Sequence, residues 1–187
     1  MKNKQYMRLD GEKIIYKKIL TNFGNLSIID NDYYLRVIPM KSAVKDRYDV
    51  MLSKLKKYGH KLTPQRLAII RILAKSEAHP SVEDISKQLK KDFPGVSEAT
   101  VYRNILLLKS LGEVLELGFA GGSTRYDGRK PHPHPHVVCM KCRRIIDPDL
   151  DSLKDMTREI KKESGFEIVT YRLDFFGICP ECRDKTG

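Results

Sequence analysis

Between residues 46 and 112, apolar side chains recur at the three- and four-residue spacing that one face of a helix requires. The pattern predicts four consecutive helices. Their expected apolar faces are Val50, Leu52, Leu55 and Tyr58; then Leu67, Ile70, Ile72 and Leu73; then Val82, Ile85 and Leu89; and finally Val101, Ile105 and Leu108. The boundary signals are Gly59 after the first helix, Thr63-Pro64 before the second, Ser81-x-x-Asp84 before the third, and Ser97 and Gly112 around the fourth.

Two short apolar segments follow the fourth helix, Val114–Leu117 and Thr124–Tyr126, with a Gly121-Gly122 turn between them. A hairpin directly after a pair of helices is typical of a winged helix-turn-helix, which binds DNA. The fourth helix would be its recognition helix, whose base-contacting groups lie near the N-terminal end. The candidates for DNA contact are Ser97, Thr100, Tyr102 and Arg103. Alternatively, Tyr102 and Arg103 are ordinary surface residues of a core helix.

Beyond a linker rich in Gly, Pro and His, the pattern predicts a small β-β-α-β unit. The expected elements are strands Val137–Cys139 and Arg144–Asp147, a helix near Leu150–Lys162, and a strand Phe166–Phe176. About 50 residues make a small core, so we expect a metal to staple this unit and a second copy to cover its apolar surface.

The expected fold class is therefore α+β, with a winged helix-turn-helix domain followed by a small zinc-stapled dimerisation domain. In residues 1–39, only Lys17–Leu20, which could end a helix, and Tyr33–Ile38, which could form a strand, are readable as elements, and these are too few for a core. We expect them to be an accessory arm, or a stretch upstream of a start at or near Met40. The expected divisions are an N-terminal extension 1–45, the DNA-binding domain 46–127, a hinge 128–135, and the dimerisation and metal-binding domain 136–187.

The distribution of charge along the chain suggests a binding partner. The chain of 187 residues has a net charge of +11, and residues 40–112 hold 15 basic against 7 acidic residues, whereas residues 113–187 hold 13 of each. A basic segment joined to a neutral one suggests that the first binds nucleic acid, although a solvated basic surface without a partner is the alternative. The sequence contains no long apolar span and no visible signal peptide, so we expect a cytoplasmic protein.

All four cysteines fall into two pairs, Cys139-x-x-Cys142 and Cys179-x-x-Cys182. Zinc prefers a tetrahedron of thiolates, and each CxxC turn presents two on one side. The 36 residues between the pairs are long enough to form the helix and strand that bring them together. Structural zinc is therefore expected, and redox dithiols or unpaired surface cysteines are the alternatives.

Three of the five histidines lie in Pro131-His-Pro-His-Pro-His136, just before the first CxxC pair. Side chains two residues apart share one face of a strand, so His134 and His136 can point at one ion. The alternative is a low-complexity linker that binds metal loosely. Further candidate ligands are His79, Asp127 and Asp147, a mixture of imidazole and carboxylate that suits iron(II), manganese or zinc. His79 alone is more often a surface or helix-end residue.

Several segments together resemble the Fur family of metal-dependent repressors. They are Thr63-Pro-Gln-Arg-Leu-Ala-Ile, Ala78-His-Pro-Ser-Val-Glu-Asp-Ile, Phe93-Pro-Gly-Val-Ser-Glu-Ala-Thr-Val-Tyr-Arg-Asn, Ser123-Thr-Arg-Tyr-Asp, the His-x-His-x-x-Cys-x-x-Cys run and Phe176-Gly-Ile-Cys-x-x-Cys. The resemblance covers about residues 46–184. It implies a homodimer that binds a palindromic double-stranded DNA operator, with one structural Zn2+ per subunit on Cys139, Cys142, Cys179 and Cys182.

The resemblance also implies one regulatory Fe2+ or Mn2+ per subunit on His79, Asp127, His134, His136 and Asp147. Asp rather than Glu at position 147 is similar to the peroxide-sensing PerR branch, in which iron-catalysed oxidation of a ligand histidine releases the operator. Two departures affect the histidine ligands: one extra residue follows Asp127, and His132 is an unexpected third candidate.

The sequence thus predicts a metal-dependent transcriptional repressor of the peroxide-sensing type. An iron- or manganese-responsive uptake regulator without peroxide sensing is the alternative within the family. An enzyme is not expected, because no general base accompanies the metal ligands and the first CxxC lies between strands rather than opening a helix. An RNA-binding zinc protein would need aromatic platforms, which the basic half lacks.

Overall fold

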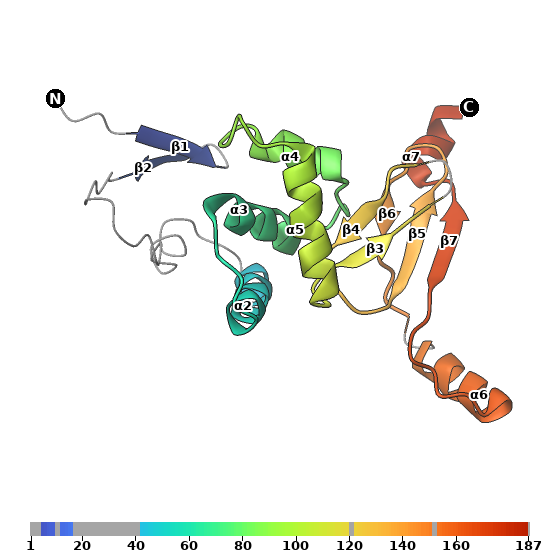
Figure 1. Cartoon of the computed structure of the whole chain (residues 1–187). Coiled ribbons are helices and arrows are strands. Elements are labelled where there is room, and N and C mark those ends of the chain that lie inside the picture. The colour runs from blue at the N-terminus through green and yellow to red at the C-terminus, as the bar shows by residue number, and fades with distance from the viewer. Residues whose placement is uncertain (1–4, 10–11, 17–41, 120–121, 151–152, 187) are drawn as a thin grey trace.

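The structure is a computed structural model that describes residues 5–9, 12–16, 42–119, 122–150 and 153–186 (Figure 1). It has a mixed α+β fold, as expected. The N-terminal hairpin comprises β1 (Gln5–Leu9) and β2 (Glu12–Tyr16), and the helical half comprises α2 (Ser42–Lys57), α3 (Pro64–Lys75), α4 (Val82–Leu89), α5 (Glu98–Ser110), β3 (Leu115–Leu117) and β4 (Arg125–Asp127). The C-terminal half comprises β5 (Pro135–Cys139), β6 (Ile145–Ile146), α6 (Leu153–Ser164), β7 (Leu173–Gly177), α7 (Pro180–Arg183) and a 3-10 turn, Asp184–Thr186.

The cap signals define three of the helices in the helical half. The side chain of Thr63 accepts a hydrogen bond from the backbone N–H of Arg66 at the start of α3, and Ser97 accepts one from Thr100 at the start of α5. Ser81 and Asp84 form a complete capping box on α4. These bonds satisfy backbone donors that the first turn of a helix leaves unpaired, so the predicted starts of these three helices are confirmed.

The apolar faces of these helices form one core, in which Leu67, Ile70, Ile85 and Ile105 are fully buried. The prediction for α2 was wrong in part, because Val50 and Tyr58 are more than half exposed. Helix α2 begins at Ser42, four residues earlier than expected, and buries its own i, i+3, i+4, i+7 set. That set is Tyr48, Met51, Leu52 and Leu55.

A nearly buried ion pair joins α2 to the chain on both sides of the β3–β4 hairpin. The Arg47 guanidinium contacts the Glu113 carboxylate before β3, and it donates to the carbonyl oxygens of Glu113 and Gly128, each at 2.6 Å. Lys54 of α2 lies 2.8 Å from the other carboxylate oxygen of Glu113. Helix α2 therefore holds Gly128, just after the end of β4, in place by a direct hydrogen bond.

The β3–β4 hairpin is antiparallel, with Glu116 opposite Tyr126, in agreement with the predicted segments. The backbone N–H of Tyr126 donates to the carbonyl of Pro80 at 3.1 Å. This bond attaches β4 to the loop between α3 and α4, so that Asp127 at the end of β4 lies near that loop.

The C-terminal half is built on a three-stranded sheet with the order β6-β5-β7. Strand β5 pairs antiparallel with β6 and parallel with β7. The expected strand Phe166–Phe176 was too long, because only Leu173–Gly177 is a strand, and Phe166 and Val169 are exposed. Leu173 pairs with Pro135, the first residue of β5.

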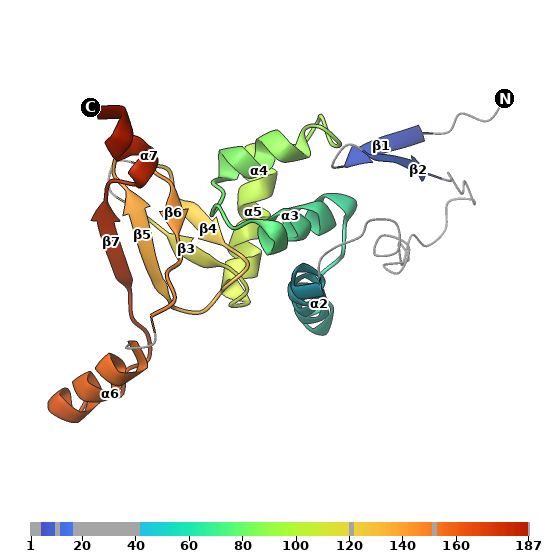
Figure 2. The ribbon, with the colours of Figure 1, turned by 180° about the vertical axis from the view of Figure 1, so that it is seen from behind.

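Helix α6 projects away from this sheet in both views of the ribbon (Figures 1 and 2). Its Met156 and Ile160 are more than 40% exposed. A single subunit therefore leaves the apolar side of α6 uncovered, as expected for a unit that needs a second copy.

The N-terminal region contains a hairpin that the sequence analysis did not predict, with Tyr6 of β1 opposite Ile15 of β2. The Asp10-Gly11 pair between two β-prone segments was the signal that could have revealed it. The expectations for Lys17–Leu20 and Tyr33–Ile38 lie outside the described residues. No helix in the described ranges is both long and apolar enough to cross a bilayer.

Candidate metal centre

Histidine and aspartate side chains from both halves converge at one point. His79 lies in the loop between α3 and α4, and Asp127 ends β4. His134 and His136 lie immediately before and within β5, and Asp147 follows β6. Residues up to 68 positions apart in the sequence therefore meet where the hairpin, the hinge and the C-terminal sheet join.

Four of these side chains form the tightest group. His79, His134, His136 and Asp147 each offer one ligand atom, and these atoms all lie within 4.8 Å of one another. His79 Nε2 lies 2.9 Å from Asp147 Oδ1, and His134 Nε2 lies 3.4 Å from Asp147 Oδ2. Asp127 is outside that group, but its Oδ2 atom lies 3.3 Å from His134 Nε2 and 3.5 Å from His79 Nε2.

The converging atoms are buried and lack hydrogen bonds. Five of these atoms have no hydrogen-bond partner among the described residues. They are Nε2 of His79, His134 and His136, Oδ2 of Asp127, and Oδ1 of Asp147. Burying such atoms without a partner is costly, and structural polar groups are normally satisfied. A cation at their centre would satisfy all of them together, so the residues fit a metal of the kind that imidazole and carboxylate ligands prefer.

The backbone of His79 has a strained conformation, which is typical of residues at functional sites. Its φ is +49°, in the left-handed region that residues other than glycine rarely adopt. Pro80 follows directly, and the side chain is only 2% exposed. Strained backbone persists where the surroundings determine it strongly, and such residues cluster at functional sites.

The remaining oxygen of Asp127 is fixed by the hinge. Its Oδ1 atom accepts hydrogen bonds from the backbone N–H groups of Arg129 and Lys130, at 2.7 and 2.9 Å. Two donors on one oxygen direct the other oxygen toward His79 and His134. Asp127 therefore ties the start of the hinge to the same cluster.

His132 does not join the cluster, and its side chain is exposed. Its backbone carbonyl lies 2.8 Å from Nδ1 of His134, a distance suitable for accepting a hydrogen bond from that nitrogen. Such a bond leaves Nε2 of His134 to bind a metal. The geometry thus brings His134 and His136 together, whereas His132 contributes through its backbone.

The charges in the cluster shift its pKa values. Burial alone would lower the pKa of His79, but the carboxylates of Asp127 and Asp147 raise that pKa to about 9. Burial alone would raise the pKa of Asp147, yet His134 and His79 hold the pKa of that carboxyl well below its usual range. Protons thus bind the atoms that a cation would use, so metal affinity should fall as the pH falls.

The four cysteines form a second cluster, in which one Sγ atom from each lies within 4.8 Å of the others. The Sγ atoms of Cys142 and Cys179 are 3.7 Å apart, too far for a disulfide. A tetrahedron with Zn–S bonds of about 2.3 Å has edges of about 3.8 Å. Hydrogen bonds from the backbone N–H groups of Cys179 and Cys142 lower the pKa of Cys139 to about 6, whereas burial raises the pKa of Cys179 to about 12.

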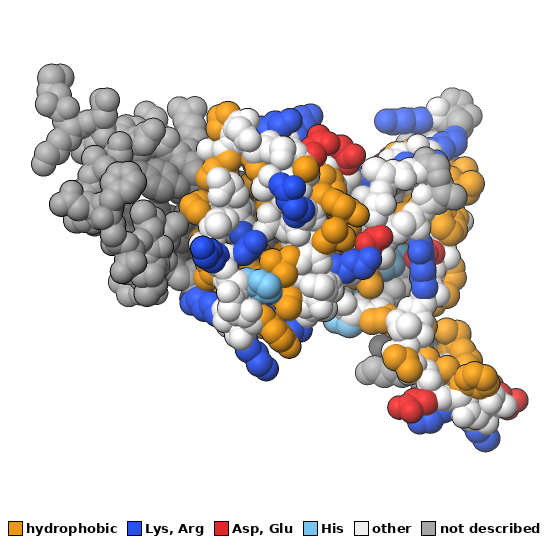
Figure 3. All heavy atoms as spheres, in the orientation of Figure 1, with side chains coloured by type: hydrophobic (Ala, Val, Ile, Leu, Met, Phe, Trp, Pro, Cys, Tyr) orange, Lys and Arg blue, Asp and Glu red, His pale blue; other side chains and the backbone are white. Residues whose placement is uncertain are grey.

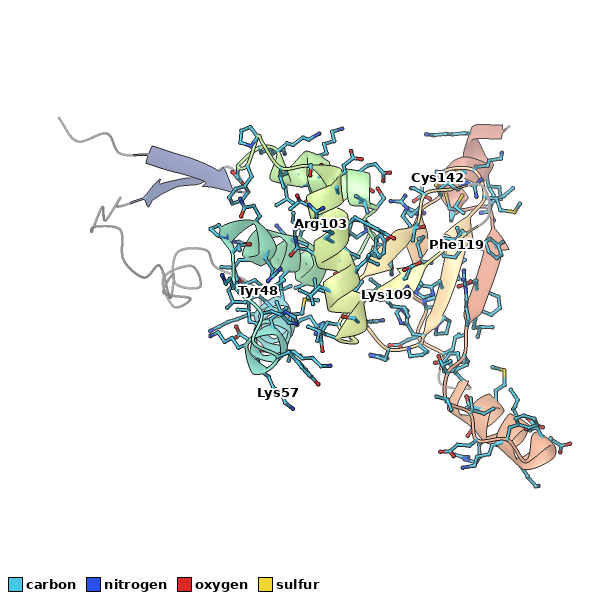
Figure 4. The ribbon with its side chains drawn as sticks, viewed as in Figure 1. Tyr48, Lys57, Arg103, Lys109, Phe119 and Cys142 are labelled. Atoms are coloured by element: carbon cyan, nitrogen blue, oxygen red, sulfur yellow. The ribbon has the colours of Figure 1, made fainter. Side chains whose placement is uncertain are left out.

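The predicted DNA-contacting residues lie on and before the first turns of α5. Tyr102 and Arg103 are exposed, whereas the hydroxyls of Ser97 and Thr100 lie 3.0 Å apart within the helix cap. Lys and Arg side chains are spread over the helical half (Figure 3), and Arg103 and Lys109 mark α5 in Figure 4. This distribution agrees with the basic charge of the middle of the chain.

Comparison with known proteins shows the family to which this chain belongs. The model of the "Ferric uptake regulator family" matches residues 57–176. The chain belongs to the ferric uptake regulator family. The family comprises dimeric, DNA-binding transcriptional regulators rather than enzymes, so the expectation that this protein is not an enzyme is confirmed.

Members of the family match about 70–76% of this chain. The peroxide-responsive repressor PerR of Staphylococcus aureus (strain USA300) is 34% identical over 143 residues, which are 76% of this chain and 96% of that protein. The peroxide stress regulator of Campylobacter jejuni is 34% identical with a TM-score of 0.58, over 70% of this chain and 98% of that one. The ferric uptake regulator of Pseudomonas aeruginosa with manganese is 31% identical with a TM-score of 0.59, over the same shares.

Proposed function

We propose that this family member is a homodimeric repressor that binds its operator when a regulatory metal joins its two halves. The observation that carries this proposal is the meeting of His79, from the helical half, with His134 at the end of the hinge and with His136 and Asp147 of the C-terminal half. A cation bound jointly by these residues favours the arrangement in which they meet. The metal then shifts the population toward that arrangement by its difference in affinity for the two forms.

The proposed division of labour follows the elements. Residues 46–127 form a winged helix-turn-helix, residues 128–135 a hinge, and residues 136–187 the dimerisation domain, with residues 1–45 as an extension. In a dimer, the two copies of α5 would enter successive major grooves of a palindromic operator. The exposed side chains of Tyr102 and Arg103 would contact bases, while Ser97 and Thr100 fix the start of the helix.

The donor sets distinguish two metals. Four thiolates favour Zn2+ and leave no open position, which suits a structural role at Cys139, Cys142, Cys179 and Cys182. Three imidazoles with carboxylates favour Fe2+ or Mn2+ at His79, Asp127, His134, His136 and Asp147. Manganese in the similar P. aeruginosa regulator supports this assignment.

We assign the protein to the peroxide-sensing type because its named relatives in S. aureus and C. jejuni respond to peroxide. When bound, Fe2+ would supply the reducing metal at which peroxide reacts. From the family resemblance, we expect the oxidised imidazole to be His79, in the helical half, or His134, in the hinge. Oxidation of either would remove a ligand that connects the halves, and the dimer would then lose the spacing that the operator requires.

Operator affinity before and after peroxide tests this proposal. Fluorescence anisotropy would compare protein loaded with Fe2+ and protein loaded with Mn2+, with a scrambled duplex as control. We expect either metal to promote specific binding, and peroxide to abolish it with Fe2+ alone. Peptide mass spectrometry should then find an added oxygen on His79 or His134, and none on His60, which lies outside the cluster.

The outcomes separate the candidate functions. Metal-dependent binding that survives peroxide with Fe2+ would indicate an iron- or manganese-responsive uptake regulator instead. Specific binding that ignores both metals would contradict the proposed role of the metal centre.

A further inference from the structure

A buried carboxylate on β7 faces the metal cluster without belonging to it. Asp174 has a side chain that is 9% exposed, and its Oδ1 atom lies 3.5 Å from Nδ1 of His136. This oxygen is buried and has no hydrogen-bond partner among the residues that the structure describes. An unpaired buried carboxylate oxygen is costly, so its position beside a candidate ligand requires an explanation.

The strand register explains how Asp174 reaches this position. Strands β5 and β7 are parallel, and His136 is paired directly with Asp174. Paired residues of neighbouring strands point to the same face of a sheet, so the two side chains lie side by side. The nitrogen that faces Asp174 is Nδ1, while Nε2 of the same ring faces Asp147 at 3.9 Å.

We infer that Asp174 is the positioning residue for His136, and that Arg172 links this pair to the β3–β4 hairpin. Histidines that bind metals commonly donate their other ring N–H to a carboxylate, which fixes the tautomer and makes the ligand nitrogen more basic. His134 has the carbonyl of His132 beside its Nδ1 atom, and Asp174 supplies the equivalent acceptor for His136. The inference rests on the proposed metal centre.

Arg172 connects the other side of Asp174 to the hairpin. Its Nε atom donates to Asp174 Oδ2, and its Nη2 atom donates to the carbonyl of Gly118, the residue after β3. The guanidinium also lies 5.4 Å from the centre of the Phe119 ring, which packs edge-on against Phe176 of β7 at 6.0 Å. Phe119 is labelled beside the C-terminal sheet in Figure 4.

These contacts form one continuous path from the cluster to the hairpin. The path runs from His136 through Asp174 and Arg172 to Gly118 and Phe119. A guanidinium has several donors in a fixed plane, so Arg172 can hold both acceptors together. Metal binding at His136 strengthens the donor Nδ1–H and orders Asp174, and Arg172 then holds the hairpin more tightly against β7. By thermodynamic linkage, a hairpin held in this position also favours metal binding.

Mn2+ affinity of the zinc-loaded dimer tests the positioning role. Asp174→Ala should weaken Mn2+ binding by about 10- to 100-fold, the usual effect of losing such a partner. Asp174→Asn should recover part of the affinity, because its amide oxygen can still accept from Nδ1, although its NH2 group then faces the Arg172 donor. Asp155→Ala, which breaks an exposed pair with Arg158 on α6, should bind as wild type. Wild-type affinity in Asp174→Ala, or no recovery in Asp174→Asn, would overturn the assignment.

Hydrogen exchange of residues 115–119 tests the link to the hairpin. In wild type, saturating Mn2+ should slow exchange there. Arg172→Gln should still bind Mn2+ within about threefold of wild type but lose most of this protection, since the 10- to 100-fold effect belongs to loss of the direct partner. Protection equal to wild type in Arg172→Gln would overturn the link. If wild type itself binds no Mn2+ at the cluster, the proposed metal centre fails, whereas failure of the variants alone leaves that centre intact.

Discussion

Replacing Arg47 by Met should destabilise the helical half more than any exposed ion pair could. The side chain of Arg47 is 11% exposed and that of Glu113 is 5% exposed. The substitution removes the donors to the carbonyls of Glu113 and Gly128 and leaves the Glu113 carboxylate with Lys54 alone, 2.8 Å away and 37% exposed. Breaking one side of a buried pair costs about 3–5 kcal/mol, and the remaining lysine places this case near about 3 kcal/mol.

Thermal unfolding followed by circular dichroism measures this effect. A loss of about 3 kcal/mol lowers Tm by about 6–12 °C for a chain of this size. Lys109→Met is the matched control, because it breaks an exposed pair with Glu116 and should cost less than about 1 kcal/mol. In the double variant Arg47→Met with Glu113→Gln, the carboxylate that lost its buried partner is neutral, so the double variant should be less destabilised than the sum of the two single effects.

A Tm for Arg47→Met within 1–2 °C of wild type, a shift worth less than about 1 kcal/mol, would refute this reasoning. So would a double variant whose loss of stability relative to wild type equals the full sum of the two single effects. Either result would mean that the contacts between α2 and the hairpin contribute little to the free energy of unfolding.

Three further predictions address the sites. Cys142→Ser should lose zinc and dimerisation together, because a four-ligand zinc site contributes folding energy directly; zinc analysis and sedimentation test this, and a folded zinc-free dimer would contradict it. Arg103→Ala should weaken operator binding by about 1–3 kcal/mol in a gel-shift titration, and equal affinity would remove Arg103 from the DNA interface. His134→Ala should lose Mn2+ binding while His132→Ala keeps most of it; equal losses would shift the histidine ligands by two residues.

Local signals in the sequence were sufficient for most helices and for the zinc cluster. Capping residues such as Ser81 and Ser97 act over three or four positions, so they can be recognised without knowledge of the fold. The CxxC pairs likewise place two ligands each by local geometry. In α2 the face was right at Leu52 and Leu55, and the error was to include Val50 and Tyr58, which lie off the i, i+3, i+4, i+7 set that begins at Tyr48.

Contacts between segments that are distant in the sequence could not all be predicted. Asp174 was not recognised, because its position beside His136 depends on the parallel register of β5 and β7. The pair of Arg47 and Glu113 depends on how α2 packs against the hairpin. His79 was a candidate ligand from its position alone, but only the family resemblance assigned it to the metal site, since nothing in its neighbouring residues reveals that the α3–α4 loop faces the C-terminal sheet.

The Mn2+ dependence of operator affinity in His79→Ala tests the central claim, that one metal joins the two halves, most directly. His60→Ala is the matched control, because His60 lies outside both clusters among the described residues. Wild type and His60→Ala should bind operator more tightly as Mn2+ is added. His79→Ala should keep its zinc and its dimer but show no Mn2+ response. A response in His79→Ala equal to that of wild type would contradict the account.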